Sequence, residues 1–169
     1  YDTGKVKQIK RHEDDSGSNY LNTYMAYDTT GRITNHWGDE GYPVEYEYDS
    51  TYGHLKKQYT YRGGSGWGNS TWASITKGTA DTTEWIVETK TGLITSKKDA
   101  ANESVIFEYN QRGQLATRIW ARGGDTDYSY DSNTAELTGV NYSDSTPDIT
   151  YVYSRLGTLQ SVTDATGTL

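Results

Sequence analysis

The sequence contains no cysteine, two prolines, one methionine and one phenylalanine among its 169 residues. The lack of cysteine excludes disulfides, thiolate catalysis and cysteine-based zinc sites. It has no apolar run close to the ~18 residues of a membrane-spanning helix, and no basic and then apolar leader at its start. Apolar residues make up only 33% of the chain. We therefore expect no membrane span and no large dry core.

Aromatic and turn-forming residues are abundant instead. The chain has 16 tyrosines, five tryptophans and 18 glycines. Tyrosine combines a large ring with a hydroxyl that needs a partner, which suits half-buried sheets. The net charge of −7 disfavours nucleic acid and anionic membrane surfaces as partners. The composition predicts an all-β fold of short strands joined by tight turns.

A short pattern recurs along the chain: aromatic, any residue, aromatic, turn-former, a few residues, glycine, any residue, aliphatic. Clear examples are Tyr46–Leu55, Phe107–Leu115 and Tyr151–Leu159, and weaker ones start at Tyr1 and Trp85. Seven copies occur, with turn positions about 22 residues apart over most of the chain. These turn positions are Gly4, Gly31, Gly53, Gly92, Gly113, Ala135 and Gly157.

Each position of the pattern has a physical reason. The turn-former, assigned as Asp, Asn, Ser or, in the Trp85 copy, Thr89, offers an oxygen that accepts a backbone hydrogen bond. Glycine then adopts the positive φ that closes the turn. The aliphatic residue opens the returning strand. Two aromatics two positions apart lie on one face of a strand, where they pack against neighbouring copies.

These residues are similar to the YD repeats of the RHS (rearrangement hotspot) family, most clearly at Tyr27–Thr34 and Leu156–Gly167. The resemblance covers nearly all of the chain except about residues 62–83. It implies antiparallel β-hairpin repeats of about 22 residues that form a curved, twisted sheet or open spiral ribbon. Bacterial RHS toxins, toxin-complex proteins and teneurins contain such repeats, and in the bacterial toxins the shell encloses a toxic C-terminal domain.

We therefore expect residues 1–169 to form a single array of about seven to eight repeats, with an irregular or degraded unit at about 62–83 and no separate catalytic or toxin domain. The expected role is a structural scaffold or shell segment of a larger RHS-repeat protein, secreted or at the cell surface. No cofactor or metal is expected. The expected partners are neighbouring repeats of the parent protein and, through exposed edge strands, other copies of the chain.

The residues that define the repeat lie at three kinds of position: in the turn, at the aromatic end of a strand, or at the aliphatic start of the returning strand. They are Tyr27, Asp28, Gly31, Ile33, Tyr48, Asp49, Gly53, Leu55, Tyr109, Asn110, Gly113, Leu115, Tyr130, Asp131, Leu137, Tyr153, Gly157 and Leu159. A substitution by valine is expected to harm folding more at Gly113, in a turn position, than at Gly64, in the irregular stretch.

Carbohydrate binding or cell-surface adhesion is the alternative function, since exposed aromatic rings stack on sugars. Trp67, Trp72 and Trp120 are the candidate glycan contacts. An enzyme is not expected: Asp125 and Asp127 form a possible carboxylate pair, but a solvated turn is the simpler interpretation. An oxygen-rich loop at 14–19 lacks the ligand spacing of a calcium loop.

Overall fold

The computed structural model describes residues 4–13 and 19–169. The start of the first repeat copy, at Tyr1 and Asp2, lies outside the described residues. Positions 14–18 of the oxygen-rich loop lie outside them as well.

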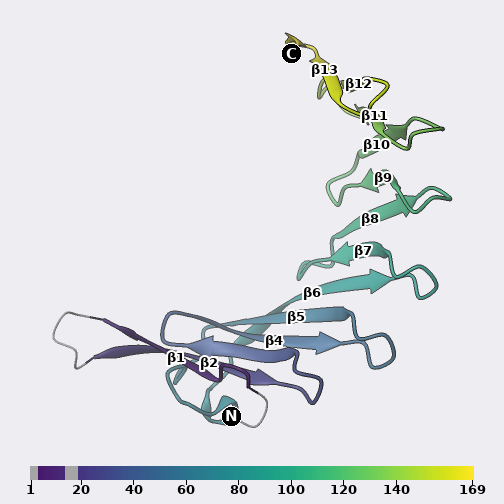
Figure 1. The fold of residues 1–169 in the computed structure, drawn as a ribbon. Helices are drawn as coiled ribbons and strands as arrows, with labels where there is room; N and C mark the ends of the chain where they lie inside the picture. Colours follow the sequence, from purple (N-terminus) through teal and green to yellow (C-terminus); the bar gives the residue numbers. More distant parts are fainter. Residues whose placement is uncertain (1–3, 14–18) are drawn as a thin grey trace. The chain divides into compact units, whose positions relative to one another are not determined.

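The described residues form fourteen β-strands that pair in chain order in one antiparallel sheet (Figure 1). The described part contains one 3₁₀ turn, at Trp72–Ser74, and no α-helix. None of the described residues forms a helix long and apolar enough to cross a membrane. The structure confirms the predicted all-β fold of successive hairpins.

The chain divides into two compact units, residues 1–85 and 86–169. The strands of the first unit are β1 (Gln8–His12), β2 (Tyr20–Tyr27), β3 (Ile33–Gly38), β4 (Gly41–Tyr48), β5 (Leu55–Arg62) and most of β6 (Thr79–Val87). The strands of the second unit are β7 (Ile94–Lys98), β8 (Ser104–Tyr109), β9 (Leu115–Ile119), β10 (Asp125–Tyr130), β11 (Leu137–Tyr142), β12 (Ile149–Tyr153), β13 (Leu159–Asp164) and β14 (Gly167–Thr168).

Five hairpins share one register. In each, the tyrosine that ends a strand is paired with the aliphatic residue that opens the next, and one residue of the returning strand is skipped just beyond that pair. The pairs are Tyr27 with Ile33, Tyr48 with Leu55, Tyr109 with Leu115, Tyr130 with Leu137, and Tyr153 with Leu159. The skipped residue is a β-bulge, which increases the local twist of the hairpin.

The first unit contains a small aromatic core. Tyr24 on β2 and Trp37 on β3 are cross-strand partners, and their rings stack with centroids 5.5 Å apart. Ile75, from the loop that joins β5 to β6, is buried against them. Trp37 is only 4% exposed, and its indole Nε1 donates a hydrogen bond to the carbonyl oxygen of Asn69, 2.8 Å away.

The loop at residues 63–78 covers this core. Trp72 contacts the ring of Trp37 edge-on at 5.4 Å. Ser65 and Thr76 exchange two backbone hydrogen bonds of 3.0 and 2.9 Å and so close the base of the loop. Strands β5 and β6 pair directly with each other. The irregular stretch is therefore a long hairpin loop folded onto the sheet, and not an additional hairpin.

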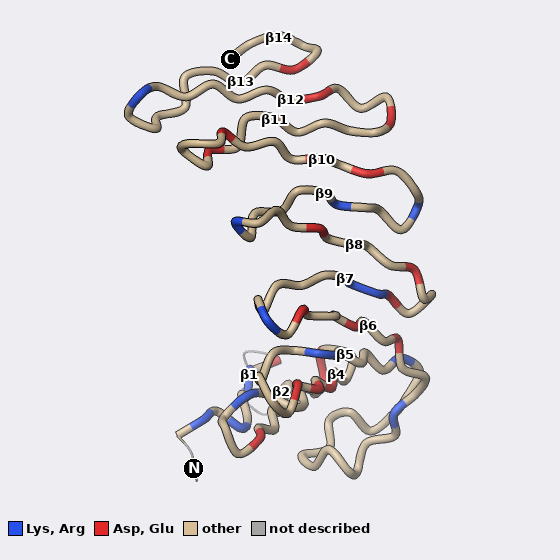
Figure 2. The backbone as a smooth tube through the Cα atoms, turned by 90° about the vertical axis from the view of Figure 1, so that its right-hand side faces the viewer, with Lys and Arg blue, Asp and Glu red and all other residues tan. Residues whose placement is uncertain are grey.

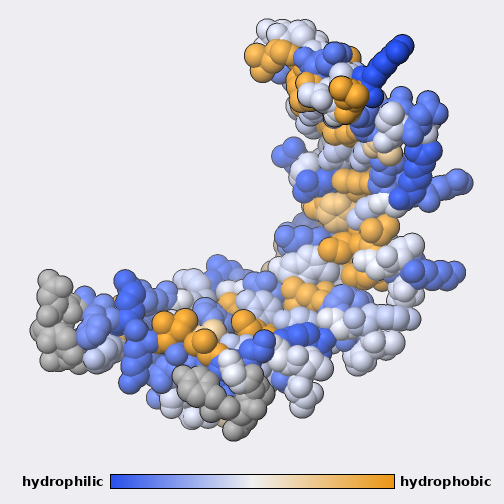
Figure 3. All heavy atoms as spheres, viewed as in Figure 1, coloured by the Kyte–Doolittle hydropathy of each residue, from blue (hydrophilic) through white to orange (hydrophobic). Residues whose placement is uncertain are grey.

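The second unit is a sheet with little buried side-chain volume. Among its described residues, Val140 and Thr126 are buried, and most other strand residues are half-buried or exposed. Figure 3 shows apolar residues over the middle of its first strands and hydrophilic residues toward their ends. In Figure 2 charges of both signs occur in the first part of this unit, from β7 to β9. Residues 123–154, in contrast, carry six acidic side chains and no Lys or Arg.

Candidate repeat interface

The turns of the repeat occur in two lengths. In the shorter turns, which start at Asp28, Asn110 and Ser154, the glycine three residues later donates its backbone N–H to the carbonyl of the turn-former at 2.9–3.0 Å. The turn-former's side-chain oxygen also accepts backbone N–H bonds; Asn110 Oδ1, for example, accepts from Arg112 at 2.9 Å. Gly113 has φ +76°, a conformation that glycine adopts without a steric penalty.

The longer turns contain one more residue. They start at Asp49, Glu88 and Asp131, and the N–H of the residue four positions later donates to the carbonyl of the turn-former at 2.8–3.0 Å. Ala135 closes the last of these turns in glycine's place, with φ +65°. In the Trp85 copy the turn-former is Glu88 and not Thr89 as predicted, because the Glu88 carboxylate accepts the N–H groups of Lys90 and Thr91.

Hydrogen bonds to the turn carboxylates lower their pKa values. Backbone N–H groups of Tyr52 and Thr51 lower the pKa of Asp49. At Asp28, partial desolvation opposes the shift, but hydrogen bonds from Arg32 and Thr30 outweigh it and hold the pKa well below its ordinary value of 3.8. These carboxylates are therefore ionised, and their charge stabilises the turns.

Tyrosine hydroxyls connect four of the hairpins to the preceding one. The tyrosine at the strand end donates its hydroxyl to the backbone carbonyl of the aliphatic residue one hairpin earlier. The bonds are Tyr27 to Val6 (2.7 Å), Tyr48 to Ile33 (2.8 Å), Tyr109 to Ile94 (2.8 Å) and Tyr130 to Leu115 (2.9 Å). Phenylalanine cannot donate this bond, which gives a physical reason for the preference for tyrosine.

The residue after the turn glycine makes a second link between hairpins. Arg32 Nη1 donates to the carbonyl of Gly53, in the turn of the next hairpin, at 3.0 Å. Gln114 Nε2 donates in the same way to the carbonyl of Ala135 at 2.9 Å. The repeat pattern accepts any residue at this position, because the residue type varies from copy to copy.

The same position also packs against the following turn glycine. A Cβ added to Gly31 would lie 3.1 Å from Lys5 Cε, and a Cβ added to Gly157 would lie 3.1 Å from Glu136 Oε1. Gly31 and Gly157 thus combine a positive φ with close approach of a neighbouring side chain. Their replacement is disfavoured on both grounds.

The described structure brings the predicted repeat-defining residues together along the hairpin edges. Each predicted tyrosine ends a strand, each predicted aliphatic residue opens one, and the turn residues lie between them. That these residues stabilise the repeat stays a prediction, which substitutions at these positions test.

The three candidate glycan-binding tryptophans lie in different surroundings. Trp67 and Trp72 are half-buried and pack against the aromatic core of the first unit. Trp120, directly after β9, lies under the Arg118 guanidinium, whose carbon is 3.6 Å from the ring centroid. Its Nε1 donates to Thr126 Oγ1 at 2.9 Å. Trp120 also lines an open hollow of about 180 Å³ with Arg122.

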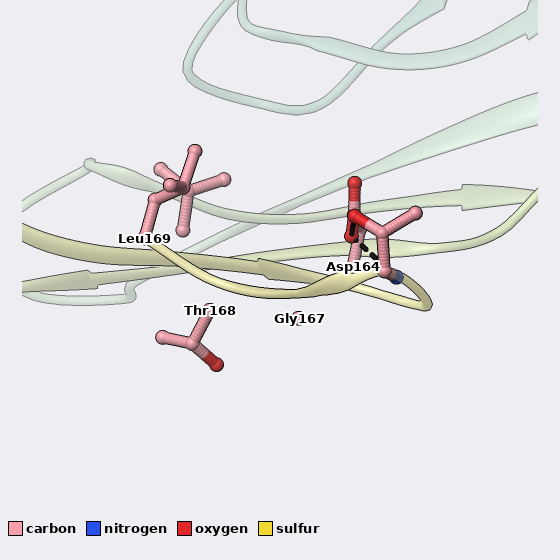
Figure 4. A pocket seen from close by; sticks show the side chains of 6 residues that line it. Asp164, Gly167, Thr168 and Leu169 are labelled. Carbon is pink, nitrogen blue, oxygen red and sulfur yellow. Dashed lines mark hydrogen bonds between the residues drawn. The ribbon is translucent and has the colours of Figure 1, made fainter.

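Asp125 and Asp127, the possible carboxylate pair, lie in strand β10 and not in a turn. Asp127 Oδ1 accepts the hydroxyl of Thr117 at 2.8 Å. Asp164 lines an open hollow of about 190 Å³ at the last hairpin (Figure 4), where it accepts both the N–H and the hydroxyl of Thr166. No group of three His, Asp or Glu side chains suited to a metal ion occurs within residues 4–13 and 19–169.

Several solved structures share this fold, among them three crystal structures. The TcdB2-TccC3-Cdc42 structure matches with a TM-score of 0.56 and 17% identity, covering 95% of this chain and 10% of the other. The structure of TcdB2-TccC3 without its hypervariable C-terminal region matches with a TM-score of 0.54, 17% identity and coverage of 94% and 10%. TcdB2-TccC3-TEV gives a TM-score of 0.50, 16% identity and the same coverage.

This chain therefore spans about a tenth of the length of the chains that it matches. No protein-family model matches its sequence, and no curated protein is significantly similar to it. At these identities the similarity shows a common fold, which agrees with the predicted resemblance to hairpin-repeat shells.

Proposed function

We propose that this chain is a wall segment of a larger RHS-repeat protein, in which successive hairpins form a β-shell that encloses or presents a toxin or effector domain. One observation carries the proposal: hairpins are joined by the same tyrosine-to-carbonyl bond at four steps in the described residues. A contact that repeats can be extended indefinitely, as in other repeat proteins. The fold shared with TcdB2-TccC3 supports it.

Protease protection in the full-length parent protein tests this proposal. A protease site is placed in the domain that follows the repeats, and its cleavage is followed over time. We expect slow cleavage in the intact protein and rapid cleavage after Tyr109→Leu, which removes a link between two hairpins. Rapid cleavage in the intact protein would contradict an enclosing wall.

Export and assembly are further parts of the proposal. We assign the parent protein to the secreted or cell-surface fraction, which fractionation of the source cells tests. Every residue of the edge strand β1 is exposed, so its backbone can pair with a second copy. Light scattering of the isolated chain is expected to show a molecular mass that rises with concentration, and a constant monomer mass would refute this pairing.

Glycan binding at Trp120 is the second candidate. The hollow beside this ring is also lined by Ser143, Asp144 and Thr146, which supply polar groups next to an aromatic surface. Titration with a polysaccharide panel is expected to quench tryptophan fluorescence, and Arg122→Ala is expected to weaken the effect. A quench that survives in Trp120→Phe would come from another tryptophan and reject this site.

A further inference from the structure

Two pairs of consecutive hairpins, one in each unit, match position by position. Both contain a short turn, a tyrosine whose hydroxyl binds the preceding hairpin, and a longer turn that follows. The corresponding residues are Asp28 and Asn110, Arg32 and Gln114, Ile33 and Leu115, Tyr48 and Tyr130, and Gly53 and Ala135. The two pairs differ in the group that lies next to this tyrosine, which is Tyr48 in the first unit and Tyr130 in the second.

In the first unit an arginine occupies this place. The guanidinium carbon of Arg32 lies 4.4 Å from the ring centroid of Tyr48. Its Nε donates to Asp28 Oδ2 at 2.7 Å, and its Nη1 donates to the carbonyl of Gly53 at 3.0 Å. A cation over an aromatic face gains electrostatic stabilisation from the ring. The fold thus shows how this kind of site holds a guanidinium.

In the second unit a pair of neutral amides replaces the ion pair. Asn110 Nδ2 donates to Gln114 Oε1 at 2.9 Å, and Gln114 Nε2 donates to the carbonyl of Ala135 at 2.9 Å. Gln114 is shorter than arginine and carries no charge. Next to Tyr130 there is an open hollow of about 380 Å³, lined by Asn110, Gln111, Arg112, Gln114, Tyr130, Asp131 and Ser132.

We propose that this hollow binds the guanidinium group of an arginine side chain presented by a protein partner. The Tyr130 ring would take the position that Tyr48 has beneath Arg32, and the carboxylate of Asp131 adds negative charge to the lining. The net charge of −7 favours approach of a basic segment. This site does not depend on the shell proposal.

Arg112 opposes the guest cation. It lines the same hollow, and its Nη2 donates to the carbonyl of Ser132 at 2.5 Å. Its positive charge repels a second guanidinium. We therefore expect the native hollow to bind a guanidinium weakly. Removal of this charge is expected to strengthen binding, whereas a guanidinium built in at position 114 is expected to block it.

The direct test is an NMR titration of the isolated chain with N-acetyl-arginine amide. We expect shifts of the amide signals at Asn110, Tyr130 and Ser132. N-acetyl-citrulline amide has nearly the same shape without the charge and is expected to bind about five-fold more weakly. Equal shifts with both compounds, or shifts at other residues only, would overturn the proposal.

Three variants separate this site from general charge effects. Gln114→Arg introduces the residue type of the first unit, and is expected to keep the fold, because Arg32 is accommodated at the corresponding position, and to abolish the shifts. Thr158→Arg adds the same charge at the equivalent position of a later turn and is expected to leave them unchanged. Arg112→Gln is expected to strengthen binding several-fold. Undiminished binding in Gln114→Arg, or a loss in both arginine variants, would contradict the assignment.

Discussion

The two units stabilise the same kind of sheet in different ways. In the first, a loop folds back onto the strands and buries Trp37 and Tyr24 together with Ile75. In the second, the described strands carry no such cover, and neighbouring hairpins are held by turn and tyrosine hydrogen bonds. A hairpin repeat thus suffices to set the register, while a local insertion adds an aromatic core.

This difference predicts where substitutions cost the most free energy. Burial of a large ring contributes several kcal/mol, whereas a single exchanged hydrogen bond contributes about 1 kcal/mol. The first unit should therefore be sensitive to loss of a few aromatic side chains. In the second unit each substitution should cost less free energy, and the stability should be distributed over many residues.

The largest effect is expected for Trp37→Ala, which leaves a cavity under the loop and removes the bond to Asn69. We expect a loss of about 3–5 kcal/mol in the free energy of unfolding, measured by urea denaturation. The control is Trp120→Ala, a half-buried tryptophan of the second unit, with an expected loss of about 1–2 kcal/mol. Equal losses would mean that the loop-covered core is not the stronger element.

The next effect concerns two glycines. A Cβ on Gly64 would collide with the carbonyl oxygen of Thr76, whereas a Cβ on Gly113 meets only Leu93 Cδ1, 3.8 Å away. Gly64→Ala is therefore expected to cost about 3 kcal/mol. Gly113→Ala is expected to cost about 1 kcal/mol from its positive φ. This order reverses the expectation from sequence, and thermal melts of the two variants decide between them.

A smaller effect is expected when a linking hydroxyl is removed. Tyr109→Phe leaves the carbonyl of Ile94 without this donor and should cost about 1 kcal/mol. Tyr128→Phe is the matched control, since no hydrogen bond of its hydroxyl occurs in the described part of the chain. If both variants unfold at the same urea concentration, the hydroxyl does not stabilise the link between hairpins.

The smallest effect is an acid-dependent loss of stability. The pKa values of Asp49 and Asp131 are lowered from 3.8 by backbone N–H groups, so their contribution is complete above about pH 4 and falls as the pH drops through the lowered values. Melting temperatures between pH 7 and pH 2 measure this loss. Asp49→Asn is expected to make the decline less steep, because the natural turn at Asn110 has no carboxylate to protonate. An unchanged decline would assign it to other groups.

The turns could be predicted from sequence because their signal is local. Asp28 and Gly31 lie within one turn, so a side-chain oxygen and a glycine at fixed spacing identify it. The same reasoning failed at Glu88, since only short side chains were considered as turn-formers. The longer glutamate accepts the same N–H groups from one residue earlier than the predicted Thr89.

Contacts between hairpins and within the loop could not be predicted. Arg32 and Gln114 occupy a position whose residue type varies, and its role becomes visible only when the next turn lies beside it. Trp37 binds the carbonyl of Asn69, far away in sequence, because the loop folds back onto the sheet. No local pattern records such a contact. The hollow beside Tyr130 could not be predicted for the same reason, because residues of two successive turns line it.

Cross-strand NOEs in the isotope-labelled chain report the register of each hairpin, on which the repeat interface depends. We expect contacts of Tyr109 with Leu115 and of Tyr130 with Leu137. In each hairpin the next residue of the returning strand, Ala116 or Thr138, is expected to have no such cross-strand partner. Helical sequential contacts, or a register shifted by one residue in these hairpins, would contradict it.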